Sequence, residues 1–509
     1  MKRQQPGYWP LHPFVVATLP VVHFYLGNFR MLEPGDGARI LLTYLTLTAL
    51  ALTVGRLVWK NVHRAALVVS PVLLVFFKGS VLGESVSLVL LTAAAVGGIL
   101  LRFRPFDARK VTLPLNMAAL VFLALPLARI GWAEFKNAPP VPVAQAETEA
   151  LNLTVPRSQH PPPDIYYLLV DGLGQPDFLD KHYSLPEGAL RQILTEHGFR
   201  VLERSRGSYP QTALAAASTL NLGYLQDLLD IPDPENFDRR VLRQLVGTNR
   251  ATVALHEAGY AVGSFPSGYP VTRLATPDHR WQPRLNPSFL EYYVLDDGLL
   301  PLLQRWSGRG PADISHGLRR HRLEYIFDHL PEARRGLPES QPLFVFAHIL
   351  APHPPFVFDA SGQALNPPVK FGFADGSHWR AIHQSDADAY RALYSAQFGY
   401  VMQRLGEAVA GILAQSPRPP VIIIQGDHGP GSALDWEDAG ATDLPERFGI
   451  YNAWYVPPGV DISLHDDEMA VNTFAVLFNG LFGLDLEPLP QECWFAPSSR
   501  PYRFGEVLR

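Results

Sequence analysis

The first 132 residues consist of long apolar segments separated by short polar gaps, and this pattern stops abruptly at Trp132. A helix needs ~20 apolar residues to cross the hydrocarbon core of a membrane, with roughly 17 to 25 the usual range. The pattern therefore predicts five membrane-spanning helices, over residues 11–25, 40–59, 65–82, 86–101 and 111–132.

Basic residues are shared unevenly among the ends and gaps of these segments. Nine Lys and Arg residues lie at the amino terminus, around the second gap and around the fourth, against three in the other two gaps. The positive-inside rule then predicts a cytoplasmic amino terminus, and an odd number of spans places everything after Trp132 outside. Lys78 and His23 lie in or beside apolar segments, and we interpret both as structural groups.

The chain beyond the apolar region begins with a Pro-rich stretch. Residues 134–163 contain seven prolines, three of them in the run 161–163. This composition favours extended, poorly packed chain. The sequence thus predicts a membrane domain over 1–133, a linker over 134–163 and an extracytoplasmic domain over 164–509.

The extracytoplasmic region has the pattern of an α/β domain. Short apolar runs at 164–170, 260–265, 342–348 and 421–426 predict buried strands, with the last of them parallel to its neighbours and covered on both faces. Predicted helices at 187–197, 213–220, 251–258, 315–329 and 386–413 separate them. Residues 266–313 are expected to be irregular and to face the substrate. A mobile acidic loop is expected after Gly429.

Two carboxylates and a histidine follow predicted strands. Asp427 and His428 come directly after the run 421–426, and Asp171 ends the run 164–170 in the sequence Asp-Gly-Leu-Gly. Ligands in open α/β sheets bind at the carboxyl ends of strands, and adjacent carboxylate and imidazole groups suit a divalent metal such as zinc or manganese. Ordinary turns, with Asp capping a backbone amide, are the alternative.

A hydroxyl group is expected at the start of a helix. In the sequence 208–221, Pro210 interrupts the chain and Thr212 occupies the expected N-cap position before a helix-forming run. The amide donors and the positive end of the helix dipole would favour an anionic group there. Thr212 is therefore a candidate nucleophile, with Ser208 as the second choice; the alternative is that Thr212 only caps the helix.

Two histidines lie at the end of the predicted strand 342–348. His348 and His353 are both expected just beyond its carboxyl end, and three prolines hold the loop around His353. A rigid loop would position His353 for an anion or a leaving group. The alternatives are that His353 is a surface group and that His348 is packed in the interior.

The overall composition narrows the class of protein. The mean hydropathy of +0.02 averages an apolar first third and a polar remainder. A net charge of −5 offers no basic field, so nucleic acid is not an expected partner. Cys493 is the single cysteine, which excludes an intramolecular disulfide and leaves the compartment undecided.

The order of these motifs resembles the alkaline phosphatase and sulfatase superfamily. With membrane spans in front, the chain looks most like the membrane-anchored branch of lipoteichoic acid synthases and phosphoethanolamine or phosphoglycerol transferases. The resemblance implies an alkaline phosphatase-like α/β/α sandwich with a mostly parallel central sheet. It also implies one divalent cation (Mn, Zn, Mg or Ca), bound by Asp171, Thr212, Asp427 and His428. Thr212 would also be the nucleophile. His353 and His348 would contact the substrate.

Three departures from the family pattern bear on the chemistry. Asp171 stands where the lipoteichoic acid and phosphoethanolamine enzymes have Glu. The segment from Ser208 to Thr212 matches the sulfatase motif C/S-x-P-x-R until its last position, where the Arg is absent. A second complete set of metal ligands is not evident either, which disfavours a two-metal site. Phosphoryl transfer is therefore favoured over sulfate ester cleavage.

The expected function follows from this resemblance. It is a membrane-anchored, metal-dependent phosphotransferase or phosphodiesterase that acts on a membrane lipid or an envelope glycan through a covalent phospho-threonine. The expected location is the inner membrane, with a periplasmic catalytic domain; the oligomeric state is not predicted. A sulfatase with formylglycine at Ser208, or a catalytically silent membrane-anchored binding protein, are the alternatives.

Overall fold

The protein divides into two compact units, residues 1–137 with 287–315 and residues 138–286 with 316–509. The computed structural model describes residues 8–32, 34–136, 141–142, 151, 162–183, 185, 189–231, 233–307, 313–367, 369 and 371–508. Lys2, Arg3 and most of the predicted linker 134–163 lie outside the described residues. The predicted domain boundaries remain predictions.

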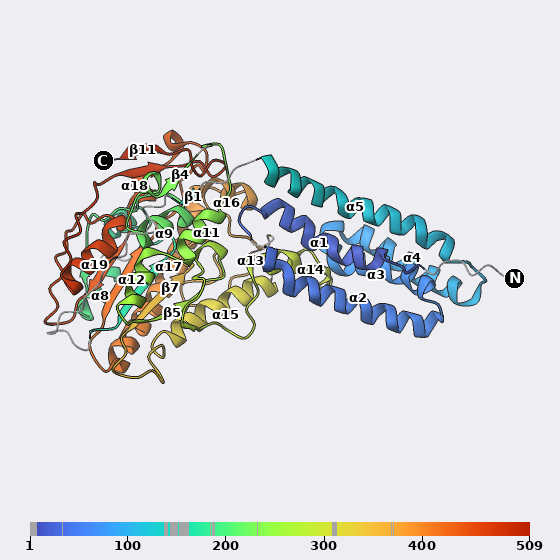
Figure 1. Ribbon diagram of the computed structural model, residues 1–509, viewed down its shortest axis with the longest axis horizontal. Coiled ribbons are helices and arrows are strands. Elements are labelled where there is room, and N and C mark those ends of the chain that lie inside the picture. The colour runs from blue at the N-terminus through green and yellow to red at the C-terminus, as the bar shows by residue number, and fades with distance from the viewer. Residues whose placement is uncertain are drawn as a thin grey trace. The chain divides into compact units, whose positions relative to one another are not determined.

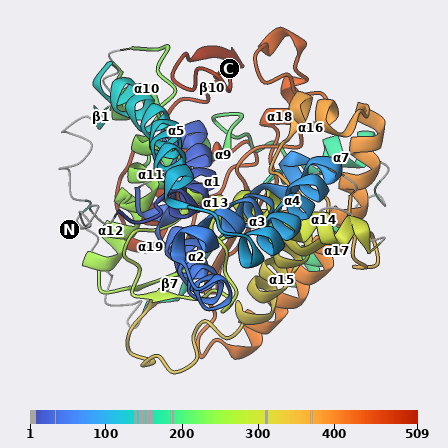
Figure 2. The same cartoon turned by 90° about the vertical axis from the view of Figure 1, so that its right-hand side faces the viewer.

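The first unit contains five apolar helices that run side by side (Figures 1 and 2). They are α1 (His12–Asn28), α2 (Ala38–Trp59), α3 (Val62–Leu82), α4 (Glu84–Phe103) and α5 (Arg109–Lys136), with a 3-10 turn η1 (Pro34–Gly37) before α2. Among the described residues, α2 to α5 are long and apolar enough to cross a membrane. The 17-residue α1 is shorter than these, so the five-span count stays a prediction.

Two further helices of the first unit come from the middle of the sequence. The segment 266–313, predicted to be irregular, contains α13 (Phe289–Asp296) and α14 (Leu299–Trp306). That prediction was wrong because the segment carries a capping box: the Ser288 hydroxyl accepts from the backbone N–H of Glu291, whose carboxylate accepts from the N–H of Ser288. The helices pack on the apolar helices.

Polar contacts hold these two helices within the first unit. Lys78 Nζ of α3 lies 2.5 Å from Asp297 Oδ2, and Arg39 of α2 pairs with Glu291. The ring of Tyr293 stacks on Phe24 of α1, with 5.0 Å between centroids. Lys78 therefore has a defined carboxylate partner in the fold.

The second unit is built on a seven-stranded sheet in the order β3-β9-β8-β2-β7-β5-β6. Its strands are β2 (Ile165–Val170), β3 (Arg200–Val201), β5 (Ala261–Phe265), β6 (His279–Arg280), β7 (Leu343–Ile349), β8 (Val421–Gly426) and β9 (Asn452–Tyr455). The five strands from β8 to β6 are parallel, and β9 and β3 add antiparallel pairs. This confirms an α/β domain with a mostly parallel sheet.

Helices cover both faces of the central strands. Tyr166 and Leu168 of β2 belong to a buried cluster with α15 (Asp313–His329) and α17 (Ala387–Gln415). On the opposite face, the Tyr167 ring meets Phe474 of α19 (Thr473–Phe482) at 5.1 Å between centroids. Every residue of β2, β7 and β8 is buried, which explains why these strands are apolar apart from His348 and Gln425.

The remaining elements surround this core. They are α7 (Pro176–His182), α8 (Ala189–Glu196), α9 (Thr212–Leu220), α10 (Leu225–Leu228), α11 (Arg240–Gly247), α12 (Arg250–Glu257), α16 (Gly376–His383), α18 (Leu444–Phe448), the 3-10 turns η3 (Pro270–Thr272), η4 (Ala439–Ala441) and η5 (Ala470–Asn472), and the pairs β1 (Val141–Pro142) with β4 (Leu229–Asp230) and β10 (Cys493–Phe495) with β11 (Gly505–Leu508). Helix α18 lies in the segment expected to be a mobile loop, and its Arg447 is fully buried.

Candidate active site

The register of the sheet brings two aspartates together. Val170 of β2 is paired with Gly426 of β8, so Asp171 and Asp427 leave neighbouring strands at the same edge. The chain turns sharply after Asp171, and Gly172 has φ +75°, a conformation that favours glycine. Its backbone N–H donates to Asp427 Oδ1 at 3.0 Å. The turn thus fixes one carboxylate relative to the other.

Thr212 is the first residue of α9 and faces this pair. Its N-cap is Gln211, so the expectation that Thr212 itself is the N-cap was off by one residue. Thr212 Oγ1 lies 3.3 Å from Asp171 Oδ2 and 3.1 Å from His428 Nε2. The start of the helix places free amide donors beside the hydroxyl, which favours negative charge there. Ser208 is also buried, and its hydroxyl has no hydrogen-bond partner among the described residues.

His428 presents an unprotonated nitrogen to the same point. Its Nδ1 lies 2.9 Å from the carbonyl oxygen of Gly429, which requires a proton on Nδ1 and leaves a lone pair on Nε2. Burial and the positive charge of Arg447 lower the pKa of His428 to about 3, so the imidazole is neutral near pH 7. Nε2 lies 3.3 Å from Asp427 Oδ2 and 3.6 Å from Asp171 Oδ1.

The two carboxylates and the imidazole fit a divalent metal. Asp171, Asp427 and His428 are almost fully buried, and each offers one ligand atom within 4.8 Å of the others. Asp171 Oδ1 and Asp427 Oδ2 have no hydrogen-bond partner among the described residues. Burial and the neighbouring Asp171 carboxylate raise the pKa of Asp427. A cation between the oxygens would relieve both the desolvation and the repulsion.

The two predicted histidines differ in their surroundings. His348 lies inside β7, not beyond its end, and is fully buried. Its Nε2 is 3.3 Å from Asp171 Oδ2, while Nδ1 lies 2.7 Å from the hydroxyls of Ser267 and Thr272. The position of His348 was mispredicted because the apolar run extends to Ile349. In this structure His348 supports the Asp171 carboxylate.

His353 lies in the loop after β7, as predicted. Its backbone N–H donates to the carbonyl oxygen of Asp171 at 3.1 Å, which anchors the loop to the site. The His353 ring centroid is 6.2 Å from that of His428, and Nε2 is 3.8 Å from Asp375 Oδ2. The peptides Ala351–Pro352 and Pro354–Pro355 are cis. His353 is therefore close to the candidate metal ligands without belonging to their cluster.

Sequence reasoning missed two charged residues at the site, Asp375 and Arg447. Arg447 Nη1 lies 2.8 Å from Asp375 Oδ2. The same guanidinium donates to the carbonyl oxygens of Pro210 and Gly429, and Nη2 is 3.2 Å from His428 Nε2. Arg447 thus ties the loop before Thr212 to the loop after His428.

The local sequence gives little signal for this pair. Arg447 is one basic residue in an acidic segment, and Asp375 precedes a short helix, α16, that was not predicted. Burial raises the pKa of Asp375, but the charges of Arg447 and His353 outweigh it and lower the pKa to about 2. The Tyr390 hydroxyl also donates to Asp375 Oδ1 at 2.6 Å. Only tertiary contacts identify these residues.

Comparisons of the sequence with known proteins give no match. No protein-family model matches the chain, and no curated protein matches it.

Solved structures do match, at low sequence identity. Lipooligosaccharide phosphoethanolamine transferase A (EptA) from Neisseria meningitidis is 11% identical, with 93% of this chain and 94% of that chain covered and a TM-score of 0.38. The C-terminal periplasmic domain of EcEptC from Escherichia coli in complex with Zn is 10% identical, with 73% and 96% covered and a TM-score of 0.41. The phosphonate monoester hydrolase of Agrobacterium radiobacter is 14% identical, with 65% and 80% covered and a TM-score of 0.40. The similar structures thus include an integral membrane phosphoethanolamine transferase and a phosphonate monoester hydrolase, each at 14% identity or less.

Proposed function

We propose that this protein is a membrane-anchored, metal-dependent phosphotransferase or phosphodiesterase with an alkaline phosphatase-like α/β/α catalytic domain and Thr212 as its nucleophile. One observation carries the proposal. The hydroxyl of Thr212 lies at the start of a helix, 3.3 Å from a carboxylate oxygen of Asp171 and 3.1 Å from the unprotonated nitrogen of His428. A hydroxyl in this position is poised to become an alkoxide.

Four residues would hold the metal. Asp171, Asp427, His428 and Thr212 offer oxygen and nitrogen donors that suit Zn, Mn, Mg or Ca. When bound, a divalent cation supplies a positive charge that stabilises an alkoxide and the oxygens of the transferred group. His428 is neutral near pH 7 because burial and Arg447 lower its pKa, so it is ready to bind without losing a proton.

The residues of the chain define a two-step displacement. Thr212 Oγ1 gives up its proton along the hydrogen bond to Asp171 and forms a bond to phosphorus, while the bond to the leaving-group oxygen breaks. His353 donates a proton to that oxygen. In the second step an acceptor hydroxyl, or water, gives its proton to His353 and attacks phosphorus. The bond between phosphorus and Thr212 Oγ1 breaks, and Thr212 takes its proton back from Asp171.

We further propose a lipid or an envelope glycan as substrate, with a cytoplasmic amino terminus and a periplasmic catalytic domain at the inner membrane. Four apolar helices of sufficient length support a membrane location. The similar EptA is named for lipooligosaccharide and phosphoethanolamine. Tethering to a membrane raises the effective concentration of an enzyme near such a substrate.

The test compares two threonine variants of the full-length protein in detergent, with bis(p-nitrophenyl) phosphate as substrate and Mn²⁺ or Zn²⁺ present. Thr212→Ala should lower turnover by about a thousandfold or more. Thr248→Ala, at an exposed threonine after α11, is the control and should change little. Retained turnover in Thr212→Ala excludes this nucleophile.

Metal analysis separates the enzyme from a catalytically silent binding protein. The intact protein should contain a stoichiometric divalent ion after exposure to Zn²⁺, and Asp427→Ala should lose it. No bound ion in the intact protein would favour the silent alternative. A formylglycine at Ser208 in a peptide mass spectrum would instead favour a sulfatase.

A further inference from the structure

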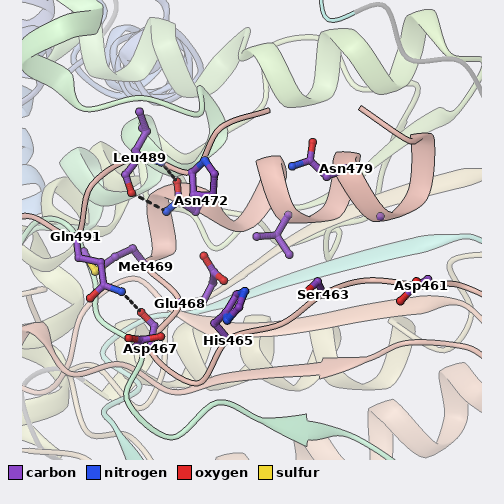
Figure 3. A pocket seen from close by; sticks show the side chains of 13 residues that line it. Asp461, Ser463, His465, Asp467, Glu468, Met469, Asn472, Asn479, Leu489 and Gln491 are labelled. Carbon is purple, nitrogen blue, oxygen red and sulfur yellow. Dashed lines mark hydrogen bonds between the residues drawn. The ribbon is translucent and has the colours of Figure 1, made fainter. Parts of the chain in front are cut away.

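A cavity of about 540 Å³ lies in the second unit between α19 and the segment 461–469 (Figure 3). None of the six residues proposed for metal or substrate binding lines it. Its volume falls within the range of small-molecule sites, roughly 300 to 1,000 Å³. The lining residues are Asp461, Ser463, His465, Asp467, Glu468, Met469, Asn472, Val476, Asn479, Gly480, Pro488, Leu489 and Gln491.

The charge of the lining is one-sided. Three carboxylates, Asp461, Asp467 and Glu468, line the cavity, and none of the described residues that line it is Lys or Arg. Asp467 is held ionised, because the side chain of Gln491 and its own backbone amide lower its pKa. A cavity with this lining attracts cations and disfavours anions such as phosphate.

Glu468 is the buried member of the three carboxylates. It is 6% exposed and lines the cavity next to His465, as Figure 3 shows. Within the described part of the chain, its carboxylate forms no ion pair with Lys or Arg and no hydrogen bond to another side chain. Burial raises the pKa of Glu468, and the Asp467 carboxylate raises it further, whereas the charge of His465 and a hydrogen bond from the backbone N–H of His465 lower it by less. A carboxylate buried without a counter-charge is costly unless a ligand supplies one.

The walls of the cavity are fixed by their own hydrogen bonds. Asn472 exchanges two hydrogen bonds with the backbone of Leu489, at 3.1 and 2.9 Å. Asn479 does the same with the backbone of Leu486, at 2.9 and 2.8 Å. These carboxamides are occupied in holding the chain, which leaves the carboxylates and Ser463 for a ligand. The cavity is therefore formed before a ligand enters.

A metal ion is a poor occupant for this cavity. Among the described residues, the cluster of His, Asp and Glu ligand atoms close enough to hold an ion is the one at Asp171, Asp427 and His428. The cavity is also far larger than one ion. A small molecule with a positively charged group fits the volume and the acidic lining of the cavity, because the molecule fills the space and its charged group pairs with Glu468.

We propose that this cavity binds a small hydrophilic molecule through a primary ammonium group, which pairs with the Glu468 carboxylate, with Asp467 as a second acceptor. The proposal goes beyond the proposed function and does not depend on it. The site would bind an amine whether or not Thr212 is a nucleophile.

The test titrates the full-length protein in detergent with glucosamine and, separately, with glucose, its uncharged counterpart of nearly equal size. Calorimetry at neutral pH should show glucosamine binding at least roughly tenfold tighter than glucose, since a hydrogen bond to a buried charge is worth about that factor. Glu468→Gln should weaken glucosamine binding by a similar factor and leave glucose unaffected.

Asp466→Asn is the matched control. It removes a carboxylate from the same segment, but Asp466 does not line the cavity and pairs with Arg200 at 3.1 Å. Wild-type affinity for glucosamine in this variant supports the proposal. Three results would overturn it: glucose binding as tightly as glucosamine, unchanged glucosamine binding in Glu468→Gln with a wild-type melting curve, or no binding of glucosamine at all.

Discussion

At the residue scale, the guanidinium of Arg447 organises the candidate site without being exposed to substrate. It is fully buried and donates to the carbonyl oxygen of Pro210, two residues before Thr212, at 2.9 and 2.7 Å. It also donates to the carbonyl oxygen of Gly429 at 3.0 Å and pairs with Asp375. These bonds fix the hydroxyl and the imidazole relative to each other, so Arg447 is a positioning residue.

Arg447→Lys should therefore lower kcat more than it changes KM. Lysine keeps the charge but cannot span both carbonyl groups with a planar fork. We expect kcat for the phosphodiester substrate to fall about ten- to a hundredfold, with a much smaller change in KM. Steady-state kinetics of the full-length protein in detergent measure both constants.

The control for this prediction is Arg404→Lys, which changes an arginine of α17 that pairs with Glu324 and Asp328 outside the site. It should keep wild-type kinetics. A wild-type kcat in Arg447→Lys, or an equal loss in Arg404→Lys, would contradict the positioning role.

The single cysteine provides a test of burial. Cys493 is fully buried at the start of β10, and burial raises the pKa of its thiol to about 12. The thiolate is the reactive form, so the folded protein should resist iodoacetamide at about pH 8. After denaturation the pKa returns to about 8.5 and the thiol should be alkylated quickly. Mass spectrometry measures the labelled fraction, and rapid labelling of the folded protein would show that this region opens.

Residues that follow a strand could be predicted from the sequence, whereas residues that act through tertiary contacts could not. Asp171 and Asp427 each follow an apolar run, which fixes their place at the sheet edge. Arg447 acquires its role only when the segment after Gly429 folds back over Pro210. No local pattern encodes that contact.

At the element scale, strongly apolar strands were predicted well and short helices with mixed composition were not. Strands β2, β7 and β8 are buried on both faces, so they are apolar apart from His348 of β7 and Gln425 of β8. Helix α13 has aromatic and acidic residues, and Pro287 precedes it. The capping box Ser288–Glu291 was the one signal that could have identified it.

Two glycines of helix α17 should respond in opposite ways to the same substitution. A Cβ at Gly399 meets no atom within 4 Å, whereas a Cβ at Gly411 would lie 2.7 Å from Pro331 Cγ. Gly399→Ala should raise the free energy of unfolding by about 0.5 to 1 kcal/mol, because alanine loses less conformational entropy in a helix. Gly411→Ala should lower it by about 1 to 3 kcal/mol through overpacking.

The quantity to compare is the midpoint of thermal melting of the two variants, because both substitutions add one methyl group to the same helix. Thermal melting of the full-length protein in detergent should give a higher midpoint for Gly399→Ala and a lower one for Gly411→Ala. Equal midpoints would mean that α17 does not pack on Pro331 as described.

At the scale of the whole molecule, the chain passes between its two units at three places instead of one. It leaves the first unit after residue 137, returns at 287 and leaves again after 315. The predicted Pro-rich linker is therefore not the one covalent connection. Because α13 and α14 belong to the unit of apolar helices, the second unit would stay attached through this segment even if the linker were cut.

The ion pair between Lys78 and Asp297 should stabilise this arrangement. Both side chains are mostly buried, at 20% and 10% exposure, and removing the partner of a buried charge is costly. Reversing one charge, as in Lys78→Glu or Asp297→Lys, places two like charges together and should lower the free energy of unfolding by about 1 to 3 kcal/mol. The double variant restores opposite charges and should recover at least half of that loss.

Melting midpoints of the full-length protein in detergent measure the effect, with Lys181→Glu as the control, since Lys181 is exposed in the second unit. Comparing the two single variants with the double variant isolates the interaction between residues 78 and 297. If each substitution destabilised the protein independently, the double variant would be the least stable of the three variants. Recovery in the double variant therefore identifies the contact between α3 and the 287–315 segment as a source of stability, and the absence of recovery assigns the loss to each site alone.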